Sequence, residues 1–191
     1  QKRKRQGTRQ RPPRRTPLGG IGKDLVLSHM DIRSEQPSDF EAIRVVHAAS
    51  FPTAAEADLV DRLRADGSAV ISQVAAEDGK IIGHVMFSKM SAPFRALGLA
   101  PVAVLSGHRR KGVAARLIKE GLRLAAAGGW QGVFVLGDPH YYTRFGFNVE
   151  AAKGFQSPYA GEHFMAMPLG GKTLPACAGR VDYAPAFAGV E

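Results

Sequence analysis

One stretch of the sequence limits the possible folds more than any other. Residues 97–105 form a nearly continuous apolar run, as expected for a central strand covered on both faces. The run leads through a basic loop into an amphipathic helix over 112–127, which Gly128-Gly129 ends. Pro101 interrupts the run, and because proline cannot donate a hydrogen bond to a neighbouring strand, it predicts a bulge or an edge there. This order of elements indicates an α/β domain.

Other segments supply the rest of a mixed sheet with helices on both faces. Asp78-Gly79 predicts a hairpin between strands over 69–77 and 80–89. Ser38 and Glu41 have the spacing of a capping box that begins a helix. The remaining predicted elements are strands at 32–33, 133–136 and 163–169, and helices at 56–65 and 140–145. The resulting order, β-α-α-β-β-β-α-β-α-β, predicts one domain over residues 31–170.

The net charge of +9 is concentrated at the N-terminus. Residues 1–30 carry nine basic side chains and one acidic, which leaves 17 basic and 16 acidic over 31–191. This composition predicts a disordered tail that binds RNA or an anionic surface. The alternative is an artificial leader, because Ser28-His29-Met30 resembles the remnant of a cloning site. The nearly neutral body gives no reason to expect a nucleic-acid-binding face.

Composition also excludes several classes of protein. No apolar run approaches the ~20 residues of a membrane-spanning helix, so the sequence predicts no membrane partner. The single cysteine, Cys177, excludes an intramolecular disulfide and a cysteine-based zinc cluster, and it fits a cytoplasmic location. No pair of histidines has metal-ligand spacing with a carboxylate, so we expect no metal.

The basic loop before the 112–127 helix has the character of an anion-binding site. The first amides of a helix have no acceptor within it, and the helix dipole adds positive potential. Gly112 and Ala114 are small enough for a diphosphate to approach the backbone. Further positive charge comes from Arg109, Arg110, Lys111 and Arg116. The glycine spacing fits neither a Walker loop nor a dinucleotide-binding fingerprint, so a solvated basic turn is the alternative on this segment alone.

Two sequence motifs, one after the other along the chain, resemble those of the GNAT family of acyl-CoA-dependent N-acetyltransferases. The Arg-x-x-Gly-x-Ala pattern over 109–114 is the first, and the Tyr-x-x-x-Gly-Phe pattern over 142–147 is the second. The longer form Gly-Asp-Pro-x-Tyr-Tyr-x-Arg-Phe-Gly-Phe, over 137–147, is typical of one branch of predicted acetyltransferases. The similarity covers roughly residues 31–169, and 179–183 also resemble that branch.

The resemblance implies a single-domain GNAT acyltransferase fold. Its mixed, bulged sheet would split between the fourth and fifth strands, so that pantetheine can lie in the gap. Residues 171–191 would form a C-terminal extension packed on the domain. Dimers are common for this fold, so a homodimer is one expected assembly.

The same resemblance implies that acetyl-CoA is the co-substrate. Its pyrophosphate would be held by the loop residues Arg109, Arg110, Lys111, Gly112, Val113 and Ala114, with Arg116 adding charge. Backbone groups of Val102 and Val104 would bond the pantetheine amides, and an amide near Val104 would hold the oxyanion. Many members have an asparagine where this chain has Val135, so we expect no side-chain bond from that position.

Tyr142 suits a general acid, because a phenol can supply the proton that a leaving thiolate needs. Core packing is the alternative for Tyr142, while Tyr141 would pack or form a wall of the acceptor pocket. For the general base, Glu56 is the first candidate, although a helix-start acid favoured by the dipole is the simpler interpretation. His84, Asp138, His140 and a chain of waters are further alternatives.

These residues predict an N-acetyltransferase in which a primary amine attacks acetyl-CoA directly in a ternary complex. The alternative is a non-catalytic domain that binds acyl-CoA as a sensor or interaction module. The loops near 51–56, 90–96 and 159–163, which would set the acceptor, carry no recognisable code. Small amines, aminoglycosides, amino acids, and protein N-termini or lysines all stay open as acceptors.

Overall fold

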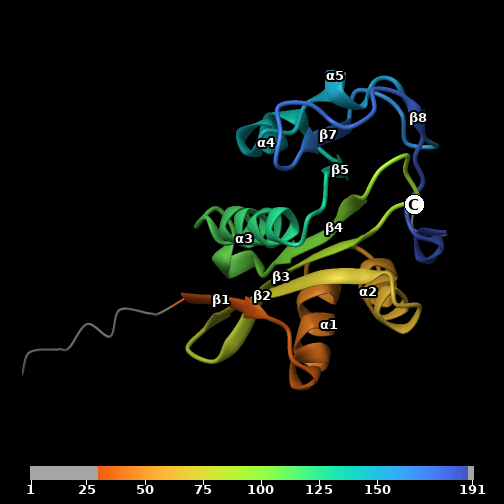
Figure 1. Cartoon of the computed structure of the whole chain (residues 1–191). Coiled ribbons are helices and arrows are strands. Elements are labelled where there is room, and N and C mark those ends of the chain that lie inside the picture. The colour runs from red at the N-terminus through yellow and green to blue at the C-terminus, as the bar shows by residue number, and fades with distance from the viewer. Residues whose placement is uncertain (1–29, 189–191) are drawn as a thin grey trace, which may run out of the picture.

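Asp78 and Gly79 form the hairpin around which the sheet is built. Their φ angles are 50° and 78°, as a two-residue turn between right-twisted strands requires. β2 (Ala69–Glu77) and β3 (Lys80–Lys89) run antiparallel from this turn, with the predicted bounds. The computed structural model describes residues 30–188 (Figure 1), so the predicted tail lies outside the described residues except for Met30.

Over residues 30–188 the main sheet has six strands, in the order β1-β2-β3-β4-β5-β7. β1 (Met30–Ser34) is antiparallel to β2, and β4 (Ala96–Val104) is antiparallel to β3. β5 (Gly132–Leu136) runs parallel to β4, and β7 (Phe164–Pro168) returns antiparallel to β5. The short strands β6 (Phe155–Gln156) and β8 (Gly179–Arg180) pair separately. The predicted mixed sheet is therefore confirmed.

Helices cover both faces of the sheet (Figure 1). α1 (Phe40–Ala48) and α2 (Ala55–Ala65) bury Ile43 and Leu63 against Met86 on one face. α3 (Val113–Ala127) buries Leu117 against Phe87 on the other. The shorter helical segments are Pro37–Asp39, Ser106–His108, α4 (Pro139–Tyr142), Thr143–Phe145, α5 (Val149–Ala152) and Pro185–Phe187. None of the described helices is long and apolar enough to cross a membrane.

The start of α1 differs from the prediction. Asp39, and not Ser38, lies at the N-cap of α1, where it makes no side-chain cap. Its carboxylate instead accepts hydrogen bonds from the Gln36 amide at 2.7 Å and from Arg33 at 2.6 and 2.9 Å. The predicted capping box between Ser38 and Glu41 is therefore wrong, because Asp39 closes the preceding turn itself.

β4 contains the predicted bulge at Pro101. Val102 pairs with Val85 and Leu99 with Phe87, so a single β3 residue faces both Ala100 and Pro101. β4 leaves β5 just before the bulge, since their pairing is confined to residues 96–98 of β4 and 132–134 of β5. The predicted split between the fourth and fifth strands is confirmed. It leaves the β5-facing edge of residues 99–104 without a partner among the described strands.

The C-terminal residues return to this opened side of the sheet. Asp182 forms a β-bridge with Ser91, and the Ala186 carbonyl accepts a 3.1 Å hydrogen bond from Arg62 on α2. Tyr183 packs directly on β4 at Gly98, where a Cβ atom would lie 2.5 Å from its ring. The segment therefore forms part of the wall beside the bulge.

A buried polar cluster joins α1 to the sheet on the face away from α3. Nε2 of His47 lies 2.8 Å from Nδ1 of His84, whose Nε2 lies 2.7 Å from the Ser72 hydroxyl. Glu35 approaches His84 at 3.6 Å and is paired with Arg64 at 2.7 Å. Burial lowers the pKa of His84 and lowers that of His47 to about 3. Both rings are therefore neutral at neutral pH.

This cluster predicts a fold that loses stability below pH 6.5. An unfolded histidine takes up a proton near pH 6.5, whereas the folded rings resist it, so protonation favours the unfolded chain as the pH falls. We expect each ring to lower the free energy of unfolding by up to about 1.4 kcal/mol between pH 8 and pH 5.5. Urea titrations at both pH values measure the difference.

Two variants assign that pH dependence to the cluster. His47→Gln removes one of the two rings, so the difference in the free energy of unfolding between the two pH values should shrink by up to about 1.4 kcal/mol. His163→Gln is the matched control, because the His163 side chain is 59% exposed, and it should keep the wild-type difference. If His47→Gln showed the same change in the free energy of unfolding between pH 8 and pH 5.5 as the wild type, His47 would not contribute to the pH dependence.

Candidate functional site

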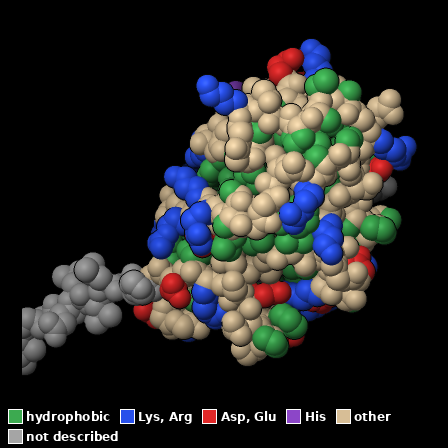
Figure 2. Space-filling model, in the orientation of Figure 1, with side chains coloured by type: hydrophobic (Ala, Val, Ile, Leu, Met, Phe, Trp, Pro, Cys, Tyr) green, Lys and Arg blue, Asp and Glu red, His purple; other side chains and the backbone are tan. Residues whose placement is uncertain are grey.

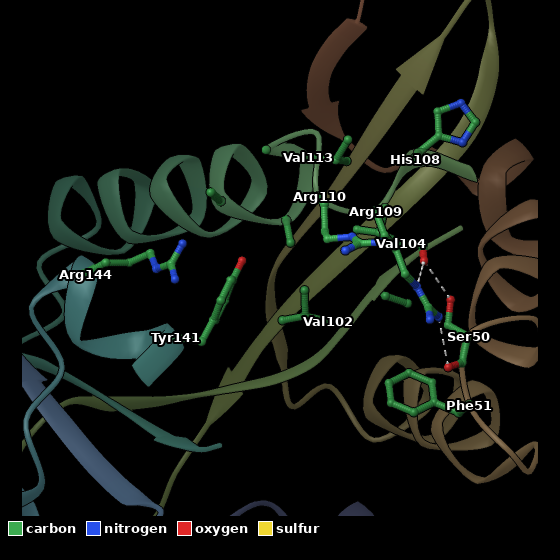
Figure 3. A pocket seen from close by; sticks show the side chains of 14 residues that line it. Ser50, Phe51, Val102, Val104, His108, Arg109, Arg110, Val113, Tyr141 and Arg144 are labelled. Atoms are coloured by element: carbon green, nitrogen blue, oxygen red, sulfur yellow. Dashed lines mark hydrogen bonds between the residues drawn. The ribbon is translucent and has the colours of Figure 1, made fainter. Parts of the chain in front are cut away.

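A cavity of about 830 Å³ lies between the bulged end of β4 and the beginning of α3 (Figure 3). Its size is in the range of sites for small molecules and cofactors. It is lined by Ser50, Phe51, Val102, Ala103, Val104, His108, Arg109, Arg110, Gly112, Val113, Ala114, Ala115, Tyr141 and Arg144. The face in Figure 2 carries Lys and Arg side chains beside exposed apolar surface.

Gly112 gives the loop its shape. It is the N-cap of α3 with a φ of 80°, a left-handed conformation that side chains disfavour. Glycine offers no side chain to cap the helix, and α3 has no side-chain cap. The amides of Val113, Ala114 and Ala115 at the helix start therefore have no acceptor within the helix, and these residues line the cavity. The arrangement can bind an anion.

The side chain of Arg109 joins the two walls of the cavity. Its Nε donates to the Val104 carbonyl at 3.0 Å, and a terminal nitrogen donates to the Ser50 carbonyl at 3.3 Å (Figure 3). The Ser50 hydroxyl also donates to the Val104 carbonyl, at 3.3 Å. Arg109 thus fixes the end of β4 against the end of α1, in addition to adding positive charge.

Most of the predicted cofactor-binding residues come together here. Those that line the cavity are Val102, Val104, Arg109, Arg110, Gly112, Val113 and Ala114. Lys111 is exposed and is not among the lining residues. Arg116 is not among them either, because its side chain donates to the Met30 carbonyl at 3.2 Å. Both cations therefore lie outside this cavity.

The prediction missed some lining residues. Arg144 lies 4.6 Å above the ring of Tyr141 and lines the cavity. Its positive charge within the motif over 142–147 could have indicated an anion-binding role. Phe51 belongs to the loop near 51–56 that was expected to set the acceptor, whereas Ser50 has no signal in the sequence, since only the fold brings it beside β4.

A second cavity of about 330 Å³ adjoins the first and shares Phe51 and Val102 with it. It is lined by Phe51, Glu56, Leu59, Leu99, Ala100, Pro101, Val102, Leu136, Tyr142, Tyr159, Tyr183 and Phe187. Tyr142 and Glu56, the predicted acid and base, both belong to it. Tyr141, which the prediction offered as packing or acceptor wall, packs against Tyr142 and Phe145 and lines the larger cavity rather than the second one.

Tyr142 is held in place by close packing. A Cβ atom on Gly137 would lie 2.4 Å from its ring, and Phe147 packs edge-on against it with centroids 5.9 Å apart. Burial, with a smaller effect of Tyr141, raises the pKa of Tyr142 to about 12. The phenol therefore keeps its proton at neutral pH and can donate a hydrogen bond to a group in the cavity.

Glu56 lies in the first turn of α2. Its Oε2 atom is buried and has no hydrogen-bond partner among residues 30–188. A buried carboxylate oxygen normally has a donor, so this atom is available to a ligand. Within the same part of the chain, no group of three or more His, Cys, Asp or Glu side chains is placed to hold a metal ion.

A family model and individual proteins are both similar to this chain. The model of the acetyltransferase (GNAT) family matches residues 30–147. The uncharacterized N-acetyltransferase YhbS of Escherichia coli K12 is 37% identical over 160 residues, which cover 81% of this chain and 96% of YhbS. The uncharacterized N-acetyltransferase YjhQ of the same strain is 37% identical over 144 residues, covering 71% and 79%.

Two solved structures are also similar. The crystal structure of Escherichia coli YhbS in complex with CoA has a TM-score of 0.79 and 35% identity, over 84% of this chain and 92% of that one. A GNAT acetyltransferase of Brucella melitensis in complex with acetyl-CoA has a TM-score of 0.71 and 34% identity, over 84% and 99%.

Proposed function

Because the chain belongs to the GNAT family of acetyltransferases, we propose that it transfers an acetyl group from acetyl-CoA to a primary amine. The observation that carries the proposal is the joining of two cavities at the split in the sheet. One has the uncapped start of α3 and arginines suited to phosphates, and the other has a protonated tyrosine and a carboxylate.

Acetyl-CoA fits the larger cavity by charge and by shape. The amides of residues 113–115, with Arg110 and Arg144 nearby, would hold the pyrophosphate. The unpaired edge of β4 at Val102 and Val104 offers backbone groups to the pantetheine amides. The similar structures with bound CoA and acetyl-CoA support this assignment. The roles of Lys111 and Arg116 are not retained in the proposal, because neither lines the cavity.

The reaction removes two protons from the ammonium acceptor, supplies one to the leaving thiolate and releases the other to solvent. Glu56 would take the proton from the ammonium group, whose nitrogen then attacks the thioester carbon. A backbone amide near Val104 would hold the oxyanion while the new C–N bond forms. The C–S bond then breaks, and Tyr142 donates its phenolic hydrogen to the sulfur. Its raised pKa keeps this hydrogen in place across the neutral range. The proton that the amide nitrogen still has to lose restores the phenol, and Glu56 passes the first proton to solvent.

Two measurements test the proposed function together. Calorimetric titration with acetyl-CoA tests donor binding, and release of free CoA thiol in the presence of amines tests transfer. Binding without release for any amine would support the non-catalytic sensor instead. Residues Tyr142 and Glu56 at the second cavity favour the enzyme.

Direct attack predicts that Cys177 is dispensable. It is exposed and lines neither cavity, so an acetyl-cysteine intermediate has no support. We expect Cys177→Ala to keep kcat within about twofold of the wild type, since an exposed position away from the site has little influence on the reaction. Thiol release with a saturating amine measures this. A loss of turnover in the folded variant would instead indicate a covalent route.

Three further expectations stay predictions. They are a cytoplasmic location, a homodimer, and nucleic-acid binding through the N-terminal tail. The tail lies outside the described residues.

A further inference from the structure

The smaller cavity has an unusual combination of lining groups. Among the described residues that line it, Glu56 is the only charged side chain. Its Oε2 atom is buried without a partner, which is unfavourable unless a ligand supplies a donor. One positively charged donor in the cavity would satisfy this carboxylate.

The other walls are mainly aromatic and aliphatic. Tyr159 and Tyr183 meet edge to face with ring centroids 5.5 Å apart, and Tyr183 lies 4.7 Å from Phe187. Leu136 stays 46% exposed although it is a large apolar residue at the end of a buried strand. These surfaces favour an apolar body.

Three of the aromatic residues that line the cavity come from outside the segment that matches the family model. Tyr159, Tyr183 and Phe187 all lie beyond residue 147, where the match to the family model ends. The segment with Tyr183 and Phe187 is fixed through the Arg62–Ala186 hydrogen bond and the bridge between Ser91 and Asp182. The shape of the cavity thus depends in part on residues outside the segment that matches the family model.

We infer that the acceptor is a small monoamine, with one primary ammonium group on an apolar body. This inference rests on the proposed function. The ammonium group would meet Glu56 while the body fills the space between the aromatic rings. The volume of about 330 Å³ is at the lower end for small-molecule sites. A polyamine or aminoglycoside would bring further cations against rings that offer no second carboxylate, which is costly.

A panel of three amines tests the class of acceptor. 2-Phenylethylamine has one ammonium group and an apolar body, ethylamine lacks the body, and spermidine adds charges. We expect kcat/KM for 2-phenylethylamine to exceed the other two values by at least about tenfold, because only this amine satisfies both the carboxylate and the rings. A preference for spermidine or equal rates for all three would overturn the inference.

Variants of the cavity test the two parts separately. Glu56→Gln keeps the shape and removes the charge, so it should lower the affinity of the protein–CoA complex for 2-phenylethylamine by at least about tenfold. Tyr159→Ala removes a partly exposed ring and should raise KM for 2-phenylethylamine while leaving that for ethylamine nearly unchanged. Phe40→Ala is the matched control, because Phe40 is 38% exposed and lines neither cavity.

Acetyl-CoA binding by each variant shows whether the fold and the donor site are intact. Binding of 2-phenylethylamine that Glu56→Gln and Tyr159→Ala leave unchanged would overturn the inference, even if acetyl transfer occurs. Conversely, binding of 2-phenylethylamine that depends on Glu56, without any thiol release, would support the cavity assignment and contradict the proposed enzyme. The two failures are therefore distinguishable.

Discussion

Gly112→Asp is expected to weaken acetyl-CoA binding at least 100-fold, or about 2.7 kcal/mol. The substitution would place a carboxylate at the start of α3, where the proposal places the pyrophosphate. Two unit charges about 4 Å apart interact by roughly 4 kcal/mol near a protein surface, so one added negative charge is enough for this loss. Calorimetric titration with acetyl-CoA measures it.

Gly112→Asn is the matched control for shape and backbone strain. Gly112 has a φ of 80°, so both variants adopt a left-handed conformation, which Asn and Asp tolerate better than other side chains. We expect each to lower stability by about 1 kcal/mol. A Cβ atom there meets nothing within 4 Å, so neither variant creates a clash in the free protein. If the Asp and Asn variants bound acetyl-CoA equally, the pyrophosphate would not lie on this loop.

Tyr142→Phe is expected to lower kcat about 100-fold while the Kd for acetyl-CoA stays within about twofold. The ring that packs on Phe147 and fills the space beside Gly137 is kept, so the fold is preserved. The hydrogen that the leaving sulfur receives is lost. Steady-state thiol release gives kcat, and calorimetry gives the affinity.

Thr143→Val is the matched control, since it removes a hydroxyl from the adjacent residue. That hydroxyl bonds the Pro139 carbonyl at 2.8 Å and lines neither cavity, so kcat should stay within about twofold. An equal kcat in wild type and Tyr142→Phe would mean that Tyr142 only packs. In that case the non-catalytic acyl-CoA sensor would gain support.

The main elements of the fold could be predicted because their signals are local. Alternation and a turn pair define β2 and β3, and Pro101 marks the bulge. The pieces that the sequence did not predict, α5, β6 and β8, have only two to four residues. Such segments are too short for a periodic pattern, and tertiary packing decides their conformation.

Most of the loop residues expected at one site line the same cavity because they form one continuous segment, but the directions of the side chains could not be predicted. Arg116 follows Ala114 by two residues, and a helix turns by roughly 100° per residue, so its side chain points away from the cavity that Ala114 lines. Tyr159 belongs to the loop near 159–163 that was expected to set the acceptor, but its packing against Tyr183 could not be predicted. Tyr183 reaches this wall because the C-terminal segment folds back over β4, which no local pattern records.

The split between β4 and β5 has a consequence for how the folded protein responds to its ligand. The two strands pair through three residue pairs, so the rest of that edge of β4 makes no backbone hydrogen bonds to β5. A donor molecule lying in the gap would take the place of the missing strand and join the two halves of the sheet. Ligand binding and the stability of the domain are then thermodynamically linked, because a ligand that binds only the folded state raises the free energy of unfolding by RT ln(1 + L/Kd), where L is the concentration of free ligand. The folded domain would be most stable with the donor bound, and the junction between β4 and β5 would open most easily when the donor site is empty.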